Sequence, residues 1–164
     1  MILQYFNKKE SSERIKAENI YKSILIKSNI FIKDNNLIDV RDYNTSFELV
    51  TIYLIIYMQI GINLKIKNFK LINEILISLF INDLDESLRS KGIGDMSIGK
   101  YVKSYVKKFY YRLKIFPNLN NGFNKDTLNE YFKSNKLFNK KMYLLASQKI
   151  HKEYEIISKE YNQI

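Results

Sequence analysis

The sequence predicts an all-α fold, a single-domain helical bundle of about six helices that covers residues 1–164. Apolar residues recur at steps of three and four along nearly the whole chain, whereas the alternation typical of strands is nowhere sustained. A length of 164 residues suits one domain, and a hydrophobic content of 46% is enough to form a core. One glycine-containing break, Lys91-Gly-Ile-Gly-Asp-Met96, divides the helical pattern most clearly.

The first predicted helix runs from about Ser11 to Ser28, and turn-forming residues follow it. Thr45-Ser-Phe-Glu48 then fits a capping box, in which a hydroxyl and a later carboxylate satisfy the first amides of a helix. The segment from Phe47 to Ile62 is apolar almost all round, which predicts the most buried helix of the bundle. Because it is shorter than the ~20 residues of a membrane span, we expect it to form a protein core.

Two amphipathic helices flank the glycine break. The third helix begins at Phe69 and ends near Lys91, where Gly92 can adopt the left-handed conformation that terminates helices. Asp95 or Ser97 can cap the fourth helix, which Pro117 ends. Its apolar stripe consists of Ile98, Tyr101, Val102, Tyr105, Phe109, Leu113 and Phe116. A short helix from Lys125 to about Ser134 and a last one from about Asn139 to Tyr161 complete the bundle.

The composition contains little that could support catalysis. Cysteine is absent, which excludes disulfides and thiol chemistry, and the single histidine, His151, lies in a polar stretch without evident ligand partners. We therefore expect an exposed histidine, no metal, no cofactor and no enzymatic activity. Asp83-Leu-Asp85 opens like a calcium loop but lacks the glycine and the closing glutamate of such a loop. Gly92-Ile-Gly94 lacks the third glycine of a dinucleotide loop.

The chain is basic, with 27 Lys and Arg against 17 Asp and Glu and a formal net charge of +10. This charge fits an anionic partner such as RNA, the ribosome surface or anionic lipid. It also fits the coding bias of an AT-rich genome, which favours Ile, Lys, Asn and Tyr. The charge alone leaves both explanations open.

Two charged residues fall where the helical pattern predicts core. At 100° per residue, Arg112 points the same way as the apolar stripe of the fourth helix, and Asp83 points near that of the third. A buried charge costs several kcal/mol unless it is paired, so each should have a partner. In an antiparallel hairpin that turns at Gly92, the two residues would be offset by ~12 Å along the helix axes. They can therefore pair with each other only if the helices cross, and otherwise each needs another partner.

The centre of the chain resembles the ubiquinol–cytochrome c chaperone family. The resemblance rests on Phe47-Glu-Leu-Val50, on Asp83-Leu-Asp85-Glu-Ser-Leu-Arg89-Ser-Lys-Gly92-Ile-Gly94-Asp95, on the basic Lys100 to Lys103, and on Phe109-Tyr110-Tyr111-Arg112. It covers about Leu37 to Phe116. Tyr53 stands where relatives often have histidine, and Tyr111 replaces a glycine.

The resemblance implies an all-α assembly factor for ubiquinol–cytochrome c reductase that attends newly made cytochrome b or another subunit. In mitochondrial relatives a small helper protein and the ribosome are further partners. It implies a bacterial member that acts in the cytoplasm at the inner face of the membrane, where a peripheral membrane contact is open to it, and no specific DNA partner. The implied contact residues are Asp83, Asp85, Arg89, Gly92, Gly94, Asp95, Tyr110 and Arg112. A basic RNA- or ribosome-binding module without a client is the alternative, although no nucleic-acid-binding motif is evident.

Overall fold

The computed structural model describes residues 12–34, 37–38, 41–117, 125–136, 138 and 142–161. It contains α1 (Ser12–Ile32), α2 (Tyr43–Asn63), α3 (Phe69–Ser90), α4 (Asp95–Ile115), α5 (Lys125–Asn135) and α6 (Tyr143–Glu160). The predicted all-α fold is confirmed, and the described ranges hold no strand. The predicted start of the last helix, residue 139, lies outside the described residues.

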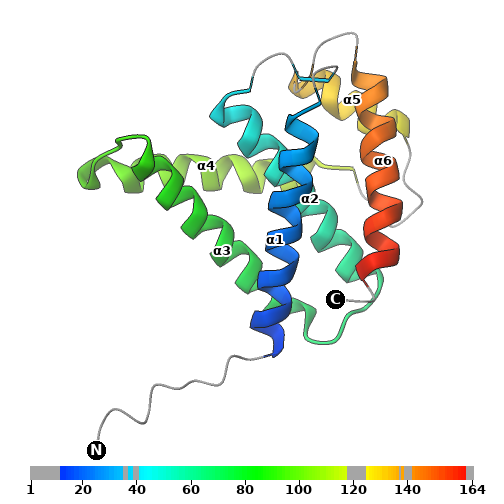
Figure 1. The fold of residues 1–164 in the computed structure, drawn as a ribbon, viewed down its shortest axis with the longest axis horizontal. Helices are drawn as coiled ribbons and strands as arrows, with labels where there is room; N and C mark the ends of the chain where they lie inside the picture. Colours follow the sequence, from blue (N-terminus) through cyan, green and yellow to red (C-terminus); the bar gives the residue numbers. More distant parts are fainter. Residues whose placement is uncertain are drawn as a thin grey trace, which may run out of the picture.

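Helix α2 forms the centre of the molecule. It packs against α1 and also meets α3, α4 and α6 (Figure 1). Leu54, Ile55 and Met58 are buried, as predicted for the most apolar helix. At 21 residues, α2 is longer than the sequence suggested, and within the described ranges it alone meets the length and composition of a membrane span. However, 72% of its most apolar stretch is buried inside the body, as in a core helix.

Helix α2 begins two residues earlier than the predicted capping box. Asp42 is the N-cap, and its Oδ1 accepts a hydrogen bond of 2.8 Å from the Thr45 backbone amide. That hydrogen bond lowers the pKa of the Asp42 carboxyl, because it stabilises the charged form. The prediction that Thr45 caps the helix with Glu48 is therefore wrong: Asp42 already satisfies the first amides. Glu48 lies inside the protein instead.

Helices α3 and α4 form a hairpin that projects from the rest of the bundle (Figure 1). Gly92 has a φ of 86°, which confirms the left-handed turn predicted there. Neither Asp95 nor Ser97 is the N-cap of α4, contrary to prediction. Gly94 occupies that position, and its backbone carbonyl alone accepts from the amides of Ser97 and Ile98.

The predicted apolar stripe of α4 is only partly core. Ile98, Phe109 and Phe116 are buried, but Tyr101 is 47% exposed. Tyr101 lies about 60° from the centre of the stripe by helical geometry. In the projecting hairpin the main neighbour of α4 is α3, so a side chain on the flank stays in solvent.

Helices α5 and α6 pack against each other and close the body on the side of α2. Leu128 and Phe132 of α5 are fully buried, as are Ala146 and Ile150 of α6. Two lysine–carboxylate pairs hold α6 to the α1 region, Lys27 with Glu153 and Lys149 with Asp34. The body is therefore continuous from the first helix to the last.

Gly61, in the last turn of α2, allows a test of how closely α2 packs against the start of α3. A methyl group at Gly61 would lie 1.9 Å from the Phe69 ring, which can move only by disturbing the start of α3. We expect Gly61→Ala to lower the free energy of unfolding by about 1–3 kcal/mol, measured by denaturant titration. Gly99→Ala is the control, because nothing lies within 4 Å there and alanine favours the helix. Equal stabilities of the two variants would contradict this packing.

Candidate functional site

The structure distributes the eight predicted contact residues over three places. Asp85, Arg89, Gly92, Gly94 and Asp95 gather at the α3–α4 turn, whereas Asp83 faces α1. Tyr110 and Arg112 lie near the other end of α4. Arg112 is 17 residues from Asp95, which corresponds to about 25 Å along the helix. One contact surface therefore does not contain all eight residues.

At the α3–α4 turn, Arg89 connects the end of one helix to the start of the next. Its Nε donates to Asp85, one turn earlier in α3, and its Nη1 donates to Asp95, the first residue of α4. These hydrogen bonds raise the pKa of Arg89, because both carboxylates favour the charged guanidinium. A lysine would have to reach both carboxylates from a single nitrogen, without the separate donors of the planar fork. The Arg89 and Asp85 side chains are partly exposed and that of Asp95 is largely exposed, so these ion pairs shape the turn at the surface.

Asp83 has the partner that its position on the apolar face of α3 required. Its Oδ2 accepts a hydrogen bond of 2.8 Å from the Tyr21 hydroxyl of α1. Burial and the neighbouring Asp83 carboxylate both raise the pKa of Tyr21, so the hydroxyl remains a donor. Next to this contact, the Tyr43 hydroxyl and the Ser87 hydroxyl are 3.1 Å apart. Asp83 therefore joins α3 to the bundle.

Arg112 has the buried carboxylate partner that the sequence predicted, and that partner is Glu48 of α2. The guanidinium donates from Nε and Nη2 to the two Glu48 oxygens at 3.0 and 2.9 Å. Its Nη1 donates to Asn135 Oδ1 of α5, and Lys108 Nζ lies 2.6 Å from Glu48 Oε1. Burial acts to lower the pKa of Arg112, but its hydrogen bonds to Glu48 raise it overall. One side chain thus ties α4 to both α2 and α5.

Sequence reasoning missed Glu48 as a member of this polar cluster. Glu48 and Arg112 are 64 residues apart, and the spacing from Thr45 to Glu48 offered a local explanation for the carboxylate. A usable signal was present: Glu48 is the only acidic residue in the apolar run from Phe47 to Ile62. An acidic residue there and a basic residue on the apolar stripe of α4 needed each other.

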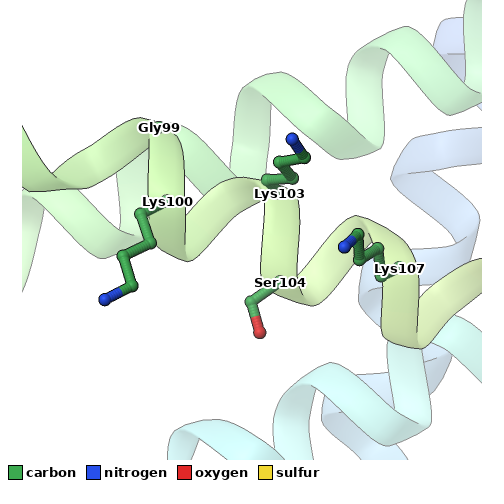
Figure 2. Close-up of a pocket in the computed structure, with 5 residues that line it drawn as sticks. All are labelled: Gly99, Lys100, Lys103, Ser104 and Lys107. Carbon is green, nitrogen blue, oxygen red and sulfur yellow. The ribbon is translucent and has the colours of Figure 1, made fainter.

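Tyr110 lies on the outside of α4, 50% exposed, with its ring against Phe109. The neighbouring outer surface of the helix is basic. Lys100, Lys103 and Lys107, which Figure 2 shows along this helix, line a hollow together with Gly99 and Ser104. The apolar stripe and the lysines thus lie on opposite sides of the helix, as the sequence pattern indicated.

The residues available for a metal or for catalysis are few. Throughout the described ranges, no three His, Asp or Glu side chains come together as a metal site would require. His151 was predicted to be exposed, but its side chain is only 18% exposed, with Nδ1 3.7 Å from Glu155 Oε1. The prediction of an exposed histidine is therefore wrong, because one side of the polar helix α6 packs on the body.

The fold and the site together define an all-helical protein with a packed body and a projecting hairpin. Two polar residues, Asp83 and Arg112, bind the hairpin to that body. The family model of the ubiquinol-cytochrome C chaperone matches residues 41–118. This match supports the resemblance to that family predicted from the sequence, over the segment that it covers. It supports a role as a ubiquinol–cytochrome c chaperone, which suggests a non-enzymatic function. Comparison with curated proteins and with solved structures gives no significant match.

The Glu48–Arg112 pair should be sensitive to geometry as well as to charge. We expect Glu48→Ala to lower the free energy of unfolding by about 3–5 kcal/mol, because Arg112 would stay buried without its carboxylate. Arg112→Ala should cost less, since Lys108 still neutralises Glu48. Arg112→Lys should also destabilise, because one ammonium cannot replace the fork. Chemical denaturation measures all three.

The matched control for these variants is Arg14→Lys. Arg14 also pairs with a glutamate, Glu18, but its side chain is 57% exposed. Pairs of that kind contribute little, so this variant should unfold like the wild type. If Arg112→Lys also unfolds at the wild-type midpoint, the bidentate geometry does not stabilise the fold.

Proposed function

We propose that the chain assists assembly of the ubiquinol–cytochrome c reductase complex by binding one of its subunits, cytochrome b in the first place, through protein–protein contacts. The observation that carries this proposal is the family match over residues 41–118. That segment begins just before α2 and ends just after α4, so it comprises the core helix and the projecting hairpin. The client would therefore be met by a preformed helical surface.

The α3–α4 turn is the part of this segment best suited to contact a client. Gly92, Gly94 and Asp95 are exposed at the end of the hairpin, and Arg89 holds the turn in shape from both sides. A surface that is ordered before binding loses less conformational freedom when the partner arrives. We assign the client contact to this turn, together with Asp85.

The other predicted contact residues receive different roles in this proposal. Asp83 and Arg112 are occupied by Tyr21 and Glu48, so we assign them to holding the hairpin on the body. Tyr110, exposed and distant from the turn, would be available to a second protein. Contacts with a small helper protein and with the ribosome stay predictions, as do the bacterial origin and the location at the inner face of the membrane.

Deletion of the gene tests the role. We expect the absorbance of assembled cytochrome b in reduced membranes to fall strongly and to return when the wild-type gene is restored. The physical reason is that an apolar subunit without its acceptor surface is exposed to aggregation. An unchanged cytochrome b spectrum after deletion would show that the chain has another function.

Arg89→Ala tests the assignment of the turn. Because the side chain is exposed, we expect thermal unfolding close to that of the wild type but poor recovery of cytochrome b in the deletion strain. Arg14→Ala is the matched control, an exposed arginine in a pair four residues along its helix and outside the matched segment. Full recovery with Arg89→Ala would refute the site while leaving the family intact.

A further inference from the structure

The side of α4 that points away from the core carries a continuous line of exposed residues. At 100° per residue it lies opposite the buried Ile98, Phe109 and Phe116. We call it the outer face of α4, and its members are Met96, Lys100, Lys103, Ser104, Lys107, Tyr111 and Lys114. From the first to the last member it extends about 27 Å at 1.5 Å per residue.

The charge of this face is of one sign. The single acidic residue of α4, Asp95, stands at its first position and binds Arg89. The two basic residues on the inner side of the helix, Lys108 and Arg112, share Glu48. The four lysines of the outer face have no ion pair with any residue that the structure describes: Lys100, Lys103, Lys107 and Lys114. Such a row attracts an anionic partner.

Three of these lysines, drawn in Figure 2, line a hollow on the helix surface. It measures about 530 Å³, is open to solvent, and has Gly99 and Ser104 between Lys100, Lys103 and Lys107. A methyl group added at Gly99 would meet nothing within 4 Å, so an anionic group could approach the helix closely there. Lysine offers flexible point charges, which suit phosphates that have no fixed orientation.

Apolar side chains stand near both ends of the lysine row. Met96 is fully exposed at the start of α4, and Tyr111 is 58% exposed beyond Lys107. Exposed apolar groups beside cations are typical of helices that lie in the interface of a membrane. Tyrosine is favoured there because its ring is buried among the lipids while its hydroxyl stays in water.

We propose that the outer face of α4 is a docking surface for an anionic lipid bilayer, with the helix lying along the membrane plane. The lysines contact headgroup phosphates, and Met96 and Tyr111 enter the interface near the two ends. Both arginines of the hairpin are bound to carboxylates, so the bidentate phosphate contacts favoured by RNA-binding proteins are missing from this face. This membrane contact does not depend on whether the chain also binds a subunit of the reductase complex.

Co-sedimentation of the full chain with lipid vesicles tests the proposal. We expect binding to phosphatidylcholine vesicles that contain phosphatidylglycerol, and none to phosphatidylcholine alone. Replacing three lysines in Lys100→Gln/Lys103→Gln/Lys107→Gln should weaken binding about 100-fold, since each lysine near an anionic surface contributes severalfold. The matched control Lys22→Gln/Lys70→Gln/Lys152→Gln removes the same charge from exposed positions on three other helices and should bind nearly as the wild type does.

A second pair of variants tests the apolar contacts. Met96→Gln and Tyr111→Gln should each weaken binding, and their effect should persist at salt concentrations that screen the lysines. If the triple variant of α4 and the triple control variant lose the same vesicle affinity, net charge spread over the whole chain explains binding and the proposal is overturned. Tighter binding of polyuridine than of anionic vesicles at equal phosphate concentration, lost in Lys100→Gln/Lys103→Gln/Lys107→Gln, would overturn it in favour of RNA. Absence of vesicle binding at low salt would also overturn it.

Discussion

The buried ion pair between Glu48 and Arg112 constrains the arrangement of the whole molecule. The apolar surface of helix α2 could be covered by many arrangements of neighbouring helices. The buried Glu48 carboxylate near its start, however, requires a neighbour that brings a cation. Arg112 meets this need with two hydrogen bonds and extends a third to Asn135. A single side chain of α4 therefore links this helix both to the start of α2 and to the end of α5. Around the pair, Phe47, Phe80 and Phe109 pack ring against ring across three helices.

The hairpin separates its two kinds of basic residue by their chemistry. Arg89 and Arg112, two of the four arginines in the chain, each bridge two partners that lie on different turns or helices. The planar guanidinium reaches its two partners from separate nitrogens in fixed directions, whereas a lysine has to serve both from one nitrogen. Lysines occupy the outer face instead, where charge matters and geometry does not. The same helix can therefore hold the fold with one face and present a cationic surface with the other.

Periodicity predicted the helices and their order, because each apolar stripe records which side of a helix is covered. It also indicated that Asp83 and Arg112 had partners, since a charge on such a stripe is costly. It could not identify Tyr21 or Glu48, because contacts across 62 and 64 residues depend on how helices cross. The exposure of Tyr101 was hidden for the same reason: a regular stripe does not reveal that the hairpin leaves the body. The residues of the predicted site extend over about 25 Å, because residues that belong to one sequence motif move apart by 1.5 Å for each residue of helix between them.

The segment that matches the family is not complete as a physical unit. Residues 41–118 include the two polar residues that fix the hairpin, yet part of what satisfies them comes from elsewhere. Tyr21 reaches Asp83 from α1, and Asn135 reaches Arg112 from α5. Without those helices a half-buried carboxylate and a buried guanidinium would each lose a hydrogen bond, at about 1–3 kcal/mol apiece, and α2 would expose much of its apolar surface. The flanking helices therefore set the angle at which the hairpin projects, and with it the surface that any partner meets.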